Sequence, residues 1–180
     1  MRVFGGWGFT ADEVERQDFA DRGYKNGVPM GGDLSNGPSG KAPAFMIRAL
    51  RDPDNANLDR VQIIKGWLKK DGTTDERIYD VAVSDGRKIN SNGRCTTPVG
   101  NTVNGASYTN TIGDPLLTAY WKDPDFDPAQ KAFYYVRVLE IPKPSWQAYD
   151  VKYYKVKMDK DVPMTVQDRA YTSPIWFNPE

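Results

Sequence analysis

The 180-residue chain contains no histidine and a single cysteine, Cys95. Without histidine it has no imidazole general base, no Ser–His or Cys–His nucleophile pair and no imidazole metal ligand. One cysteine excludes an internal disulfide and a cysteine-based zinc site. Because an activated thiol needs a partner base, we interpret Cys95, which follows Arg94 in a polar segment, as incidental. The residue types therefore point away from enzymes that depend on histidine or cysteine.

Net charge and long apolar runs are lacking as well. Lysine plus arginine number 24, as do aspartate plus glutamate, so the formal net charge is zero. Nucleic acids and anionic membranes are usually bound by a basic surface, so we expect neither as a partner. No stretch approaches the roughly 20 apolar residues that cross a bilayer. No signal peptide is recognisable either, since a basic region, an apolar run and a small-residue cleavage site are missing.

What the sequence does contain is a series of short β-strand patterns separated by turn residues. Its 16 glycines and 13 prolines suit many turns. Because helices and strands do not alternate regularly, a doubly wound sheet is disfavoured. We predict a mainly β, antiparallel β-sandwich, Greek-key or jelly-roll-like, as a single domain over residues 1–180. The predicted strands cover residues 2–9, 44–50, 60–68, 76–84, 116–121, 132–141 and 167–177.

One or two short helices are expected beside these strands. Thr10 and Glu13 have the spacing of a capping box, which predicts a helix from there to about Arg22, ended by Gly23. Ser145 is a suitable cap for a second short helix, over the segment that contains Trp146 and Tyr149.

Two acidic clusters invite a metal or an acid–base interpretation. Asp123, Asp125 and Asp127 have the spacing of the first three ligands of a calcium loop, but proline stands at the sixth position and tyrosine at the twelfth. We favour a proline-braced turn and expect no cofactor in this chain; a calcium-stabilised structural module is the alternative. The second cluster, Asp52, Asp54 and Asp59, is interpreted as a solvated loop. An enzyme that uses carboxylates alone stays possible, but no pair is singled out.

The aromatic residues are numerous, with 5 tryptophans, 10 tyrosines and 7 phenylalanines. Most of them are expected in core and domain-contact packing. The cluster around Trp146 and Tyr149 is harder to bury and predicts an interface. Our candidates for contact with another domain or a ligand are Trp7, Trp146, Tyr149 and Trp176.

Seven segments, taken in order, resemble one family. They are residues 2–10, 27–34, 52–67, 98–103, 123–128, 132–142 and 169–176. They look like the C-terminal part of a large bacterial family of uncharacterised proteins related to PHP-type and carbaryl-hydrolase-like metal-dependent hydrolases. The resemblance covers essentially the whole chain.

The resemblance implies a longer protein with an upstream catalytic domain that carries the histidine and aspartate ligands of a divalent metal. It also implies that many members are exported, so a periplasmic parent protein is expected. No metal-ligand motif of the family matches a position here. Because Met1 directly precedes strand-like sequence, we expect an excised C-terminal accessory domain that packs against the catalytic domain and is inert alone. The alternative is a stand-alone ligand- or carbohydrate-binding module that uses exposed aromatic residues.

Overall fold

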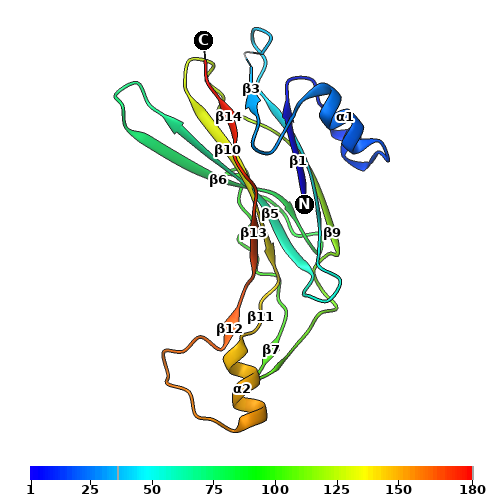
Figure 1. Ribbon diagram of the computed structural model, residues 1–180, viewed down its shortest axis with the longest axis vertical. Coiled ribbons are helices and arrows are strands. Elements are labelled where there is room, and N and C mark those ends of the chain that lie inside the picture. Colours follow the sequence, from blue (N-terminus) through cyan, green and yellow to red (C-terminus); the bar gives the residue numbers. More distant parts are fainter. Residues whose placement is uncertain (36, 180) are drawn as a thin grey trace.

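The computed structural model, which describes residues 1–35 and 37–179, contains two β-sheets packed face to face (Figure 1). The four-stranded sheet has the order β2 (Val28–Pro29), β1 (Arg2–Gly6), β4 (Ala44–Leu50) and β9 (Leu116–Lys122). The six-stranded sheet has the order β3 (Asp33–Leu34), β14 (Ile175–Phe177), β10 (Ala132–Glu140), β5 (Leu58–Leu68) and β6 (Thr74–Val83), and β13 (Arg169–Tyr171) also pairs with β10. Among the described pairs only β3 and β14 run parallel. The predicted antiparallel sandwich is confirmed.

The core lies between the two sheets, because alternate side chains of the long strands point inward. From the six-stranded sheet, Ile63 of β5 and Val136 of β10 are opposite each other and buried. Phe45 and Ile47 of β4 lie in the same core cluster from the other sheet. The five central predicted strands agree with β4, β5, β6, β9 and β10 to within two residues at each end.

The last predicted strand, residues 167–177, is two strands in the structure. β13 and β14 both pair with β10, and Pro174 lies between them. Thr172 keeps the chain beside β10 across the break, because its N–H donates to the Val136 carbonyl at 3.0 Å and its hydroxyl accepts the Val136 N–H at 2.9 Å. Proline lacks the N–H that a continuous ladder needs, which explains the interruption.

The predicted helix over residues 11–22 is also divided, into a 3-10 turn η1 (Ala11–Glu15) and helix α1 (Phe19–Asn26). The capping contact is present, since the Thr10 N–H donates to the Glu13 carboxylate at 2.9 Å. The expectation that Gly23 ends the helix is wrong. Gly23 lies inside α1, where a Cβ would come within 2.3 Å of the Phe4 side chain. Because glycine has no Cβ, α1 can approach the outer face of the four-stranded sheet.

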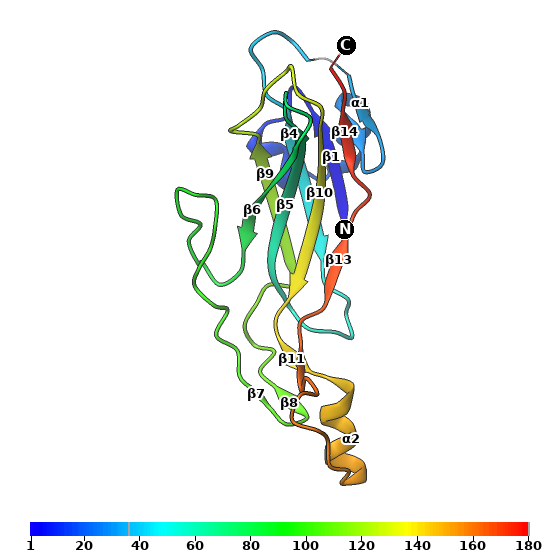
Figure 2. The ribbon, with the colours of Figure 1, turned by 90° about the vertical axis from the view of Figure 1, so that its left-hand side faces the viewer.

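At one end the sandwich continues into an arm, which both side views show as a narrow projection (Figures 1 and 2). The arm consists of β7 (Val103–Asn104), β8 (Ser107–Tyr108), β11 (Lys143–Pro144), α2 (Trp146–Tyr154) and β12 (Thr165–Val166). Ser145 precedes α2 at the N-cap position, so the second predicted helix is confirmed. Across the described residues, no helix is long and apolar enough to span a membrane.

Candidate functional site

A buried ion pair crosses the core between β5 and the turn after β9. Lys65 follows the inward alternation of Val61 and Ile63, so its side chain enters the sandwich. Its Nζ lies 2.6 Å from Asp123 Oδ2, and both residues are only 3% exposed. The Tyr134 hydroxyl donates to the same carboxylate oxygen at 2.7 Å. A carboxylate surrounded in this way is a structural anchor of the core.

The three aspartates of the calcium hypothesis have separate partners. Asp125 accepts hydrogen bonds from the Tyr79 hydroxyl at 2.6 Å and from the Arg77 guanidinium at 2.8 Å. The Asp127 side chain accepts the Ala129 N–H at 2.9 Å. Within residues 1–35 and 37–179, no three histidine, cysteine, aspartate or glutamate side chains are grouped so that they could hold a metal ion. The three carboxylates are thus directed at separate partners, and the calcium alternative stays a prediction.

Two tyrosines of this cluster should make the free energy of unfolding decrease at alkaline pH. Burial, together with the Asp123 carboxylate, raises the pKa of Tyr134 well above its ordinary value of 10.0, and burial with Asp125 raises the pKa of Tyr79. Both phenols therefore stay neutral in the folded chain at pH values where the same phenols ionise in the unfolded chain. Their stabilising contribution is complete below about pH 10 and is lost as the pH rises above it.

We expect the free energy of unfolding to fall more steeply above pH 10 in the wild type than in a Tyr134→Phe variant. One titrating phenol accounts for about 1.4 kcal/mol per pH unit in this range. Urea unfolding at a series of pH values measures both slopes. Tyr24→Phe, which alters an exposed tyrosine, should leave the slope of the wild type unchanged. Equal slopes for the wild type and Tyr134→Phe would contradict this role of Tyr134.

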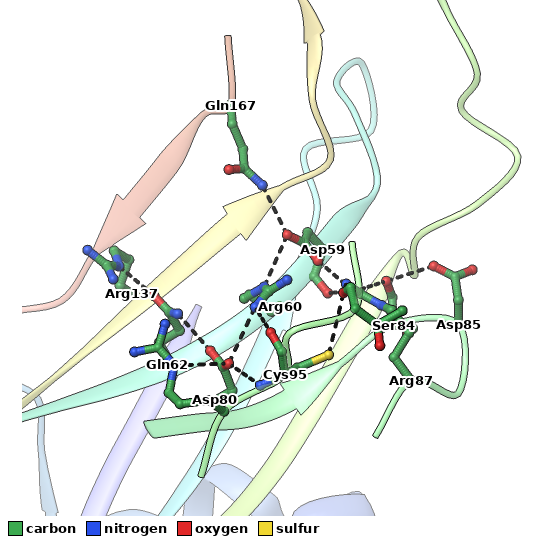
Figure 3. A network of polar contacts seen from close by, with 12 residues as sticks. Asp59, Arg60, Gln62, Asp80, Ser84, Asp85, Arg87, Cys95, Arg137 and Gln167 are labelled. Carbon is green, nitrogen blue, oxygen red and sulfur yellow. Dashed lines mark hydrogen bonds and ion pairs between the residues drawn. The ribbon is translucent and has the colours of Figure 1, made fainter. Parts of the chain in front are cut away.

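A second polar network lies on the outer side of the six-stranded sheet (Figure 3). The Asp80 side chain is fully buried and accepts the Gln62 amide at 2.6 Å and the Cys95 N–H at 2.7 Å. Arg60 lies between the two acidic groups, 3.3 Å from Asp80 and 3.1 Å from Asp59. Because guanidinium groups pair with both carboxylates, the network holds the segment after β6 against the sheet and is unsuited to acid–base chemistry.

Asp59 corrects one sequence interpretation. It is only 3% exposed, whereas Asp52 and Asp54 are exposed, so the acidic cluster is not one solvated loop. Arg87 approaches the Asp59 carboxylate at 2.5 Å and Gln167 donates to it at 3.0 Å. The difference arises because Asp59 belongs to β5, and partners that are distant in sequence enclose it.

Aromatic side chains form a row on the outer face of the six-stranded sheet. The row runs from Trp176 to Phe133, Tyr135 and Tyr171, with successive ring centroids 5.3, 6.3 and 6.3 Å apart. Phe133 leans over Gly66, where a Cβ would lie 2.4 Å from the ring. Trp176 is 43% exposed and Tyr171 is 54% exposed. We call these four residues the aromatic row. A depression of about 660 Å³ opens beside its Trp176 end.

A larger cleft of about 690 Å³ lies where the arm meets the sandwich. Trp146 and Tyr149 of α2 line it, and Trp146 is 85% exposed. Lys143 also lines the cleft, where it lies 2.6 Å from Asp168 and donates to Asn55. Burial alone would lower the pKa of Lys143, but its acidic neighbours outweigh this and raise it. We call this site the arm cleft.

The four aromatic residues selected from the sequence therefore occupy three places. Trp146 and Tyr149 meet in the arm cleft, and Trp176 lies in the aromatic row. Trp7 is partly buried against the core, where its indole N–H donates to the Ser35 carbonyl at 3.1 Å.

Sequence reasoning did not select Phe133 or Tyr135, although the signal was present. Both alternate with the inward residues Tyr134 and Val136, which places them on the opposite face of β10. The same alternation on β5 would have placed Lys65 in the core.

The comparison with protein families gives one result. Residues 1–179 match the family described as a protein of unknown function, DUF3604. No curated protein and no solved structure matches the chain. Since the match spans nearly the whole sequence, the chain belongs to the DUF3604 family.

Proposed function

We propose that this chain is a non-catalytic accessory domain that packs, through the aromatic row, against the catalytic domain of a metal-dependent hydrolase related to the PHP-type and carbaryl-hydrolase-like enzymes. The proposal extends to the location implied by the same resemblance, the periplasm. The divalent metal of the reaction would belong to the catalytic domain, where histidine and aspartate ligands are expected.

The observation that supports this proposal is the aromatic row. Its rings, together with the 40% exposed Leu68, form an apolar surface on a sheet face that no described helix covers. Such contiguous apolar surfaces on soluble domains mark contact sites. Aromatic residues are also enriched in the buried centres of protein interfaces.

The pairing of two buried aspartates with cations and hydrogen-bond donors supports the proposal that the domain is non-catalytic. Asp123 is paired with the buried Lys65, and Asp80 is paired with Arg60 and accepts the Cys95 N–H. A general acid or base must instead reach a substrate proton from an accessible position. We therefore expect the isolated chain to hydrolyse no ester or phosphodiester when divalent metal is added.

The docking proposal predicts the effect of a charge in the aromatic row. In a binding assay between this chain and the separately purified catalytic domain, Trp176→Asp should weaken the affinity at least about tenfold, because a carboxylate would be buried in an apolar contact. The side chain of Trp176 is partly exposed, so the variant should still fold. Trp146→Asp, on the arm, is the matched control and should bind like the wild type. No binding by the wild type, or equal loss in both variants, would contradict the proposal.

The alternative function, a ligand-binding module, is favoured by an observation at a different place, the arm cleft with its exposed Trp146.

A further inference from the structure

We propose that the arm cleft is a binding site for a neutral saccharide. This site is separate from the aromatic row, and the inference goes beyond the proposed docking function. Its basis is the combination of exposed aromatic side chains with preorganised polar groups in the lining of the same cleft. A sugar ring presents an apolar C–H face and a rim of hydroxyl groups, so it requires both.

The aromatic side chains belong to α2. Only Ala148 of this helix is buried, so the helix holds little of the core. Trp146 stands at the first position of α2 and is 85% exposed, while Tyr149, three residues later, lies on the same side and lines the same cleft. A large aromatic ring that the core does not use is available to stack on a ligand.

The polar groups are held in place before any ligand arrives. Lys143 contacts Asp168 at 2.6 Å, Glu140 at 3.3 Å and the Asn55 side chain. These contacts restrict the rotamers of the groups that would bind hydroxyls, which lowers the entropic cost of binding. Asp168 bonds Lys143 through Oδ2 and remains 47% exposed, so its carboxylate is accessible as an acceptor.

The charges of the cleft favour a neutral ligand. Among the described residues that line it, Asp54 and Asp168 are acidic and Lys143 alone is basic, and Lys143 is already paired with carboxylates. A phosphate or uronate would meet these carboxylates without a free cation to offset the repulsion. Hydroxyl groups, in contrast, can donate to the carboxylates and to the Asn55 carbonyl oxygen. The cleft volume of about 690 Å³ also falls within the range typical of small-ligand sites.

Titration of the whole chain with neutral oligosaccharides, followed by the tryptophan indole N–H signals in NMR spectra, tests the inference. The probes are cellotriose, maltotriose, xylotriose and diacetylchitobiose, with trigalacturonate as the anionic comparison. We expect at least one neutral probe to shift the Trp146 signal saturably, with a Kd of about 1 mM or below. Trp146→Ala should abolish this binding, and Asp168→Asn, which preserves the shape of the side chain, should weaken it at least about fivefold.

Trp176→Ala, in the aromatic row, is the control and should bind the saccharide like the wild type. Circular dichroism would verify that each variant is folded. The inference is overturned if no neutral probe shifts the Trp146 signal, if binding persists in Trp146→Ala, or if only trigalacturonate binds. None of these outcomes bears on the docking test, because that test depends on Trp176.

Discussion

Replacing Asp123 with asparagine is expected to lower the free energy of unfolding by about 3–5 kcal/mol. The amide has nearly the size of the carboxylate, so the loss would arise from charge rather than from a cavity. The Lys65 ammonium, 3% exposed and 2.6 Å from Asp123, would remain buried without its counter-charge. Urea unfolding at neutral pH, followed by far-UV circular dichroism, measures the change.

Asp127→Asn is the matched control for this prediction. It makes the same chemical change in the same turn, where the partly exposed side chain accepts the Ala129 N–H. Its effect should stay below about 1 kcal/mol. If Lys65 and Asp123 act as a pair, Lys65→Met should cost much less in the Asp123→Asn background than alone. An Asp123→Asn variant as stable as the control, or strictly additive effects, would refute the importance of the pair.

Asp80→Asn is expected to cost about 3 kcal/mol of stability and to loosen the segment that follows β6. Its carboxylate accepts the Gln62 amide through one oxygen and the Cys95 N–H and Arg60 through the other. The asparagine NH₂ group would face either the Gln62 amide or the Cys95 N–H and Arg60, all of which are donors. The positive charge of the Arg60 guanidinium would also lose one of its counter-charges. Hydrogen exchange at residues around Cys95 should accelerate more than exchange in β10, because the network anchors that segment locally.

Asp75→Asn provides the comparison on the same strand. Asp75 is about half exposed and pairs with Lys69 at 2.8 Å on the surface. Its loss should change the free energy of unfolding by less than about 1 kcal/mol. A uniform acceleration of exchange over the chain, or an effect of Asp80→Asn no larger than that of Asp75→Asn, would contradict the anchoring role.

The strands and the second helix were predictable because their signals are local. Alternation along residues 132–138 places Tyr134 and Val136 on one face, and Ser145 stands at the N-cap position of α2. The first helix was predicted less well. Gly23 has the residue type of a helix end, and only its contact with Phe4 of β1 shows why glycine is needed inside α1.

The candidate sites were partly predictable for the same reason. Trp146 and Tyr149 were selected because their cluster is hard to bury, and the structure places both in one cleft. Trp176 was selected only as a candidate contact residue. Phe133, Tyr135 and Tyr171 complete the aromatic row only because β13 and β14 both pair with β10. Which strands become neighbours is a property of the whole sheet, so no local pattern reveals this row.

By itself, the sequence determined the mainly β class, the positions of the long strands, and the lack of histidine- and cysteine-based chemistry. These follow from composition and from short-range periodicity. Only the tertiary structure decided which charged residues are inside. Lys65 and Asp59 have side chains that normally face water, and they are buried because Asp123 and Arg87, distant in sequence, supply opposite charges at 2.6 and 2.5 Å. Burial of a charge depends on its partner, and the partner is selected by the packing of the sheets and their loops.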